Sequence, residues 1–181
     1  MNKLLIDDVL TLCTEAQQTI EHVLNCARQS ILKKVSKKGK ISSDILNSEQ
    51  FAVHGFSWLA IYVEGLRQIL AWAKRLESSG ELDELEILIV QAAYGEYLNQ
   101  IAGGISISQT EIIRPTDIGI ESGDIDRLSK DASQRLRVAG NTAQTRSQIA
   151  TLIANGNFGK LGLEDDTFNL IHQQITRFIN D

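Results

Sequence analysis

Apolar residues recur in steps of three and four along most of the chain, which is the spacing of one face of an α-helix. The first stripe covers residues 5–31, the second residues 56–73 and the third residues 82–101. Turn residues at 78–80 separate the second stripe from the third. The pattern therefore predicts three long helices, and we expect the second to be central because several aromatic residues enlarge its contact surface.

The stretch after the third stripe is less regular. The Gly103-Gly104 pair predicts a break, and residues 105–113 are expected to form a separate short helix. That helix should end at Arg114, because the residue before a proline is disfavoured in the helical region of backbone space. Residues 116–123 are predicted to be a connecting loop.

Helical spacing resumes over residues 124–153, so a fourth long helix is predicted, with a kink at Gly140 and Asn141. Three glycines within residues 155–163 indicate a flexible linker, and a last helix is expected from about Glu164. A helix of about fifteen residues is marginal when isolated. Its apolar face is therefore expected to pack against the bundle or against a surface outside the chain. This candidate docking face consists of Phe168, Ile171, Ile175 and Phe178.

Together these elements predict an all-α fold: an antiparallel bundle of about four long helices plus a short C-terminal helix. Residues 1–155 would form the bundle domain, and residues 156–181 the glycine-rich linker and the start of the last helix. The single proline, Pro115, supports this class, since sheet proteins of similar length use several prolines in turns and at edges.

Charge and hydropathy bear on the partners. A net charge of −5 and a pI near 5.2 argue against nucleic acid, which requires clustered positive charge. A basic run between Lys33 and Lys40 is interpreted as a helix C-terminus, with an anionic partner or a lipid headgroup as the alternative. No run reaches the about 20 apolar residues of a membrane span. Asp7 and Asp8 interrupt the N-terminal apolar stretch, so neither a membrane anchor nor a secretory signal is predicted.

Both cysteines, Cys13 and Cys26, fall in the first predicted helix. Their spacing corresponds to about 20 Å along a helix, whereas a disulfide joins Cα atoms about 6 Å apart. They cannot bridge each other within one chain. Because free thiols are typical of reducing compartments, we expect a cytoplasmic protein.

The sequence shows no recognisable motif for catalysis, cofactor binding or metal binding. The glycine pairs do not form a phosphate-binding loop, the cysteines lack zinc-site spacing, and the Glu-x-x-His motif of di-metal bundles is absent. The three histidines, His22, His54 and His172, lie on separate segments. We therefore expect no catalytic, cofactor or metal site in this chain.

The remaining candidates are polar residues set among apolar ones: His54, Glu64, Arg67, Glu96, Gln109, Glu111 and Arg114. We interpret them as structural residues that cap, pair and fix the register of helices. A catalytic carboxylate and a ligand contact are the alternatives. Glu64 and Arg67 are three apart and predicted to pair. Glu96, between Tyr94 and Tyr97 on an apolar helix, is expected to be buried and hydrogen-bonded.

Two stretches of the chain resemble a known family. Residues 51–76 and 93–120 are similar to the N-terminal extension of the methylsuccinyl-CoA dehydrogenase group of acyl-CoA dehydrogenases. The motifs that carry the resemblance are His54-Gly55 with Trp58, Gly95-Glu96-Tyr97, Gly103-Gly104, and Ser108-Gln109 followed by Glu111 and Arg114-Pro115. Residues 161–181 look like the start of the first helix of the dehydrogenase body. The first predicted helix of the chain matches only in its helical character.

In that family the extension precedes an FAD-dependent body, which holds the flavin site and the glutamate that removes the α-proton of the acyl-CoA. We expect no such body in this chain, which would make it a fragment or a free-standing remnant. The resemblance therefore implies a non-catalytic accessory domain, with FAD expected only in the body. Its implied partners are an acyl-CoA dehydrogenase body and/or a second copy in a homodimer. A free-standing protein–protein interaction module and a small acyl-CoA-binding bundle are the alternatives.

Overall fold

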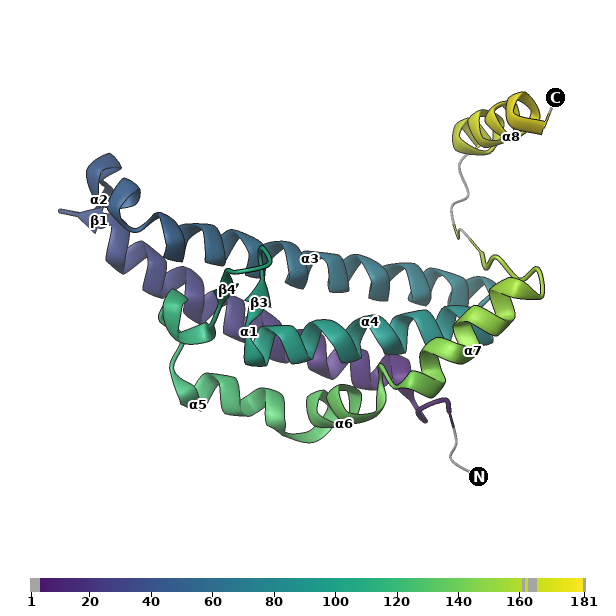
Figure 1. The fold of residues 1–181 in the computed structure, drawn as a ribbon, viewed down its shortest axis with the longest axis horizontal. Coiled ribbons are helices and arrows are strands. Elements are labelled where there is room, and N and C mark those ends of the chain that lie inside the picture. Colours follow the sequence, from purple (N-terminus) through teal and green to yellow (C-terminus); the bar gives the residue numbers. More distant parts are fainter. Residues whose placement is uncertain (1–3, 161, 163–165, 181) are drawn as a thin grey trace.

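Three long helices form the framework of the molecule. The computed structural model describes residues 4–160, 162 and 166–180. The long helices are α1 (Val9–Val35), α3 (Gln50–Ser79) and α4 (Glu84–Gly103), and they run side by side in Figure 1. Their positions match the three apolar stripes, so the all-α class and these three helices are confirmed.

A short hairpin joins α1 to the next helices. It consists of β1 (Ser36–Lys37) and β2 (Lys40–Ile41), and α2 (Ser43–Ser48) follows it. Its turn residues Lys38 and Gly39 both have positive φ angles, which suits a tight two-residue hairpin turn. Of the basic run, Lys33 and Lys34 lie in the last turn of α1. The remaining lysines lie on the β1–β2 hairpin, at the left-hand end of Figure 1, so the interpretation of the run as a helix C-terminus is wrong for them.

The stretch after α4 is a second hairpin, so the short helix expected over residues 105–113 is wrong. Strands β3 (Ile105–Ser106) and β4 (Ile112–Ile113) pair antiparallel, and Ile105 and Ile113 are buried against the helices. Isoleucine and serine alternate in this segment with the period of two that is typical of a strand. Gly104, with φ of 133°, ends α4 in a conformation that favours glycine.

The fourth long helix predicted over residues 124–153 is also wrong, because shorter helices replace it. The elements of this region are η1 (Pro115–Ile118), α5 (Ser122–Ile125), η2 (Asp126–Ser129), α6 (Asp131–Ala139) and α7 (Ala143–Ala154). One break lies at Asp131, whose φ is 46°. The other lies before α7, where the Thr142 hydroxyl accepts a hydrogen bond from the Thr145 amide at 3.1 Å and caps the helix.

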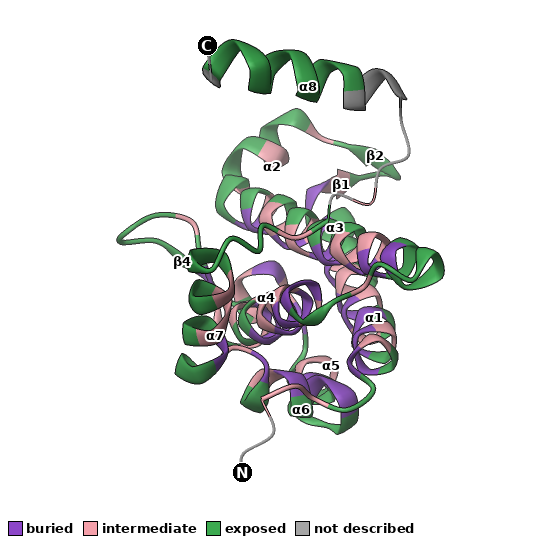
Figure 2. Cartoon of the chain, turned by 90° about the vertical axis from the view of Figure 1, so that its right-hand side faces the viewer, coloured by how far each residue is buried: buried purple, intermediate pink, exposed green. Residues whose placement is uncertain are grey.

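The central helix is α4, so the expectation that the helix of the second stripe, α3, would be central is wrong. It packs against α1, α3, α6 and α7, and the end-on view in Figure 2 shows it among them. Its apolar residues are distributed around the helix rather than along one face, which is typical of a helix buried on several sides. The buried apolar residues of α4 are Leu85, Leu88, Val90, Tyr94, Leu98 and Ile101.

The segment before the last helix is attached to the ends of α3 and α4. Trp72 Nε1 donates a hydrogen bond to the Lys160 carbonyl at 3.2 Å, and the Lys160 amide donates to the Glu86 carboxylate at 2.7 Å. Arg75 Nε donates to the Gly162 carbonyl at 3.4 Å. The last helix, α8 (Asp166–Asn180), stands apart from the bundle in Figure 1. Within the described ranges, no helix combines the length and hydropathy needed to cross a membrane.

Candidate functional site

A row of aromatic rings follows one face of α3 and continues onto α4. His54, Trp58 and Tyr62 are spaced four residues apart, which places their side chains on the same face of the helix. Trp58 Nε1 donates to His54 Nε2 at 2.9 Å. The Trp58 and Tyr62 rings meet edge to face at 6.2 Å, and Tyr62 meets Tyr97 of α4 at 4.6 Å between ring centroids. These contacts fix α3 against α4.

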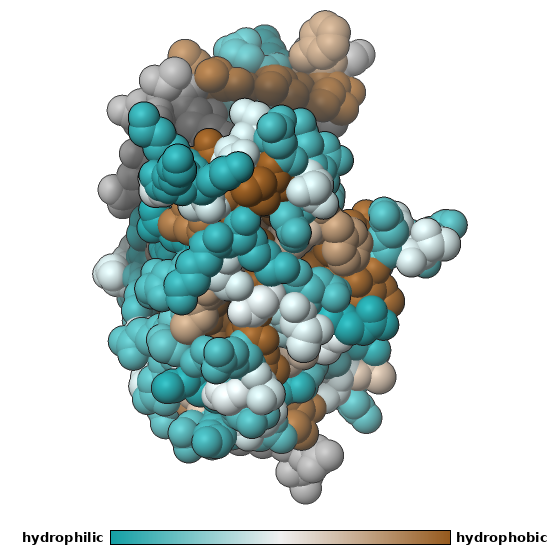
Figure 3. Space-filling view, turned by 90° about the vertical axis from the view of Figure 1, so that its left-hand side faces the viewer, coloured by the Kyte–Doolittle hydropathy of each residue, from teal (hydrophilic) through white to brown (hydrophobic). Residues whose placement is uncertain are grey.

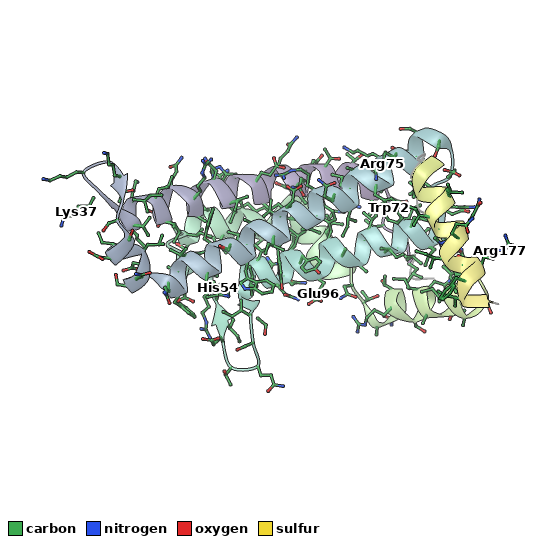
Figure 4. All side chains as sticks on the ribbon, turned by 90° about the horizontal axis from the view of Figure 1, so that it is seen from above. Lys37, His54, Trp72, Arg75, Glu96 and Arg177 are labelled. Carbon is green, nitrogen blue, oxygen red and sulfur yellow. The ribbon has the colours of Figure 1, made fainter. Side chains whose placement is uncertain are left out.

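A chain of polar side chains extends this row to α7. The Tyr62 hydroxyl donates to Gln100 Oε1 at 2.8 Å, and Gln100 Nε2 donates to Glu96 Oε1 at 2.7 Å. Asn141 Nδ2 donates to the other oxygen of Glu96 at 2.8 Å, and Arg146 in turn donates to the Asn141 side-chain oxygen at 3.0 Å. His54 and Glu96 lie along the same side of the bundle in Figure 4. The row thus brings together His54, Trp58 and Glu96, three of the motif residues.

Glu96 is exposed, so the expectation of a buried carboxylate is wrong. Its helix is apolar on several sides, but the position of Glu96 faces the solvent-accessible edge between α4 and the α6–α7 turn. Hydrogen bonds from Gln100 and Asn141 lower the pKa of Glu96 below its usual value, and they outweigh the opposing effect of partial desolvation. The carboxylate is therefore ionised at neutral pH and accepts a hydrogen bond that joins α4 to the α6–α7 turn.

The substitution Glu96→Ala is expected to lower the free energy of unfolding at pH 7 by less than about 1 kcal/mol, because the carboxylate is exposed and screened. A carboxylate whose pKa is lowered in the folded state stabilises the fold when it is ionised. Its contribution to the free energy of unfolding is fully present above the unfolded-state pKa and is lost as the pH falls through the folded-state pKa. The difference between wild type and variant, measured by urea unfolding, should therefore shrink as the pH is lowered from neutral into the acid range. Glu77→Ala, at another exposed helical glutamate, is the control. A larger effect at acid pH than at neutral pH would contradict the assignment.

Glu64 lies outside this row. It pairs with Arg67 on the surface of α3, as predicted, and Arg67 Nε also donates to Glu21 of α1 at 3.0 Å. Gln17 Nε2 donates to the same Glu21 oxygen at 3.0 Å. These contacts join α1 to α3 and lower the pKa of Glu21, the Gln17 hydrogen bond contributing most.

The remaining motif residues lie on the β3–β4 hairpin and the turn after it. Gln109, Glu111 and Arg114 are exposed. The Glu111 amide donates to the Ser108 hydroxyl at 3.1 Å, and the Arg114 amide donates to the Asp117 carboxylate at 2.7 Å. These bonds stabilise the local turns, in keeping with a structural role.

The candidate docking face is exposed where the structure describes it. The side chains of Ile171, Ile175 and Phe178 are 53%, 54% and 86% exposed, while the side chain of Phe168 lies outside the described residues. Leu170 and Ile179 add to the exposed apolar area. These side chains form the brown row at the top of Figure 3, above a mostly hydrophilic surface.

One group of possible metal ligands was missed from the sequence. His22, Cys26 and Asp124 place one ligand atom each within 4.8 Å of one another. The spacing of His22 and Cys26, four apart on one predicted helix, was the available signal. Asp124 comes from a segment 102 residues further along, which spacing alone does not bring near.

Comparison with known proteins supports the family resemblance. No protein-family model matches the chain. Over 98% of its length, the chain is 45% identical to a protein of Cereibacter sphaeroides named (2S)-methylsuccinyl-CoA dehydrogenase. The chain spans 32% of the length of that protein. The resemblance predicted from the motifs is thereby confirmed, and it extends over α1, where the sequence motifs gave no match.

Proposed function

We propose that this chain is a non-catalytic accessory domain of an FAD-dependent acyl-CoA dehydrogenase of the methylsuccinyl-CoA type. It would correspond to the N-terminal extension of such an enzyme and serve its packing or assembly. The similarity over 98% of the chain but only 32% of the relative supports this proposal, because about two thirds of the relative lies outside the matched region. FAD and the acyl-CoA would be bound in that remaining body.

The observation that carries the proposal is the exposed apolar face of α8. An isolated helix of this length gains too little from its own hydrogen bonds to be stable in water, so it needs a surface to cover its apolar side. Ile171, Ile175 and Phe178 follow helical steps of four and three, which is how an amphipathic helix presents anchors to a groove. We propose that the dehydrogenase body covers this face, because about two thirds of the relative lies outside the region that matches this chain.

The attachment of residues before α8 indicates where that body would sit. Hydrogen bonds from Trp72 and Arg75 hold the carbonyls of Lys160 and Gly162 at the end of α3, six and four residues before α8 begins at Asp166. Trp72 and Arg75 lie at the α8 end of the bundle in Figure 4. A body docked on α8 would therefore contact the end of the bundle where α3 and α4 meet, far from the β1–β2 hairpin and Lys37.

A binding isotherm between this chain and a separately expressed dehydrogenase body of the relative tests the proposal. We expect micromolar or tighter binding, and at least about 30-fold weaker binding for the double variant Ile175→Glu/Phe178→Glu, because buried apolar anchors contribute about 2 kcal/mol or more. The melting temperature of the chain should not change, since both side chains are exposed. Gln173→Glu adds one charge to the opposite face of α8 and should leave binding unchanged.

Two results would contradict the proposal. Absence of binding by a folded chain would remove the body as partner, and concentration-dependent self-association lost in the double variant would indicate a free-standing interaction module. A rise in melting temperature on addition of an acyl-CoA to the chain alone would instead favour a small acyl-CoA-binding bundle.

A further inference from the structure

We infer that His22, Cys26 and Asp124 form a binding site for one divalent transition-metal ion, for which Zn²⁺ is the best chemical match. This inference is independent of the proposed docking role. His22 and Cys26 lie four residues apart on α1 and share one face of the helix. Asp124 belongs to α5, the short helix that approaches this face of α1. The three ligand atoms lie within 4.8 Å of one another.

The distances from His22 Nε2 to the other two ligand atoms are close to those between ligands of a tetrahedrally coordinated ion. Bond lengths of about 2.0–2.1 Å to nitrogen and about 2.3 Å to sulfur place these two atoms about 3.6 Å apart around tetrahedral zinc. Cys26 Sγ lies 3.6 Å from His22 Nε2. Asp124 Oδ1 lies 2.9 Å from the same nitrogen, in a hydrogen bond. An ion requires about 3.4 Å between this oxygen and the nitrogen, so a shift of about half an ångström in Asp124 would match that distance.

The ligand types restrict the ion. A thiolate and an imidazole favour zinc and neighbouring transition metals, whereas Mg²⁺ and Ca²⁺ prefer oxygen ligands alone. Copper also binds such a set tightly, but zinc accepts the mixed nitrogen, sulfur and oxygen ligands in tetrahedral geometry without a redox requirement. Zinc bound here would join α5 to α1, in place of the hydrogen bond between His22 and Asp124.

The fourth coordination position is accessible to solvent. The side chains of His22 and Asp124 are 43% and 25% exposed, and His22 also lines a surface cavity of about 630 Å³ between α1 and the α5–α6 region. A water molecule or a small ligand can therefore complete the coordination. Arg127 lies 3.6 Å from the Asp124 oxygen and opposes a cation, but its side chain is 57% exposed and free to turn away into water.

Titration of the reduced, metal-free chain with Zn²⁺ tests the site, with a chelator of known affinity as competitor. We expect one ion per chain, micromolar or tighter affinity, and a higher melting temperature, because an ion that binds only the folded state stabilises it. Co²⁺ should give tetrahedral d–d bands and a thiolate-to-metal charge-transfer band. Bound Zn²⁺ should protect Cys26 from alkylation.

Variants identify the ligands. His22→Gln, Cys26→Ser and Asp124→Asn are each expected to weaken Zn²⁺ binding at least about 100-fold, since loss of even an outer-shell partner changes affinity by about 10–100-fold. Cys26→Ser should also lose the charge-transfer band. His54→Gln and Asp126→Asn, at an exposed histidine and a neighbouring exposed aspartate, should bind as wild type. No saturable binding, a charge-transfer band that persists in Cys26→Ser, or equal losses in the control variants would overturn the inference.

Discussion

Replacement of Gly95 by valine is expected to lower the free energy of unfolding by about 3 kcal/mol or more, because the side chain would collide with backbone. A Cβ atom at Gly95 would lie 2.6 Å from the Asn141 amide nitrogen and 2.9 Å from the Gly140 Cα atom. A backbone cannot turn aside as the end of a flexible side chain can. The α6–α7 turn would therefore have to move away from α4.

The approach is equally close from the other side. A Cβ atom at Gly140 would lie 2.5 Å from the Gln91 carbonyl oxygen and 2.9 Å from Gly95 Cα. The Gly95-Glu96-Tyr97 motif thus combines the glycine that allows this close approach with the carboxylate that accepts a hydrogen bond from Asn141 Nδ2 at 2.8 Å. Displacement of the turn would disrupt both contacts.

Urea unfolding followed by circular dichroism measures the effect, with Gly65→Val as the control. Gly65 is also a helical glycine, but apart from its own helix backbone and its chain neighbours no atom lies within 4 Å of a Cβ placed there. Its replacement should change the free energy of unfolding by only about 0.5 kcal/mol, through helix propensity. If both valine variants changed stability equally, the close packing of α4 on the α6–α7 turn would be excluded as the cause.

The long helices could be predicted from the sequence because their stripes persist for many turns. The buried residues of α1 and α3, such as Ile20 and Leu59, occupy the expected positions. The β3–β4 hairpin is short, and its alternation of isoleucine and serine covers only a few residues. In the region after Ser122, the apolar spacing continues across the breaks, so only local signals such as the Thr142 cap mark them.

The candidate sites were less predictable because they depend on contacts between segments. Spacing within a helix brings His54 near Trp58, and His22 near Cys26, but it does not place Asn141 beside Glu96 or Asp124 beside His22. The family resemblance selected several residues of the aromatic row without indicating their burial. Glu96 is expected to be buried only because it lies between Tyr94 and Tyr97 on an apolar helix, and the sequence does not show that this position of α4 faces solvent. Distances from the folded chain were required for both groups.

Tyr94→Ala is expected to lower the free energy of unfolding by about 3–5 kcal/mol, which is a large part of the about 5–15 kcal/mol typical of a domain. Tyr94 is fully buried in α4. Its hydroxyl donates to Gln17 Oε1 of α1 at 2.9 Å and lies 3.2 Å from the Leu66 carbonyl of α3. Gln17 Nε2 donates onward to the Val63 carbonyl at 3.3 Å. Removal of the ring leaves a cavity where three helices meet.

Tyr94→Phe separates the ring from the hydroxyl. It keeps the ring and should lower stability by about 1–3 kcal/mol, because Gln17 is buried and loses its donor. Tyr62→Phe, which removes a hydroxyl from a half-buried ring, should lower it by about 1 kcal/mol or less. Urea unfolding measures all three, and equal losses for the two phenylalanine variants would contradict the buried network.

The same hydroxyl predicts a dependence on alkaline pH. Burial raises the pKa of Tyr94 far above its usual value of about 10, with smaller contributions from neighbouring groups. A group whose pKa is higher in the folded state than in the unfolded state stabilises the fold. Its contribution to the free energy of unfolding is fully present below the unfolded-state pKa and is lost as the pH rises from there through the folded-state pKa. Above about pH 10 the unfolded chain releases this proton while the folded chain retains it, so wild-type stability should fall with pH. Tyr94→Phe should fall less steeply over the same range, because the phenylalanine ring has no proton to lose.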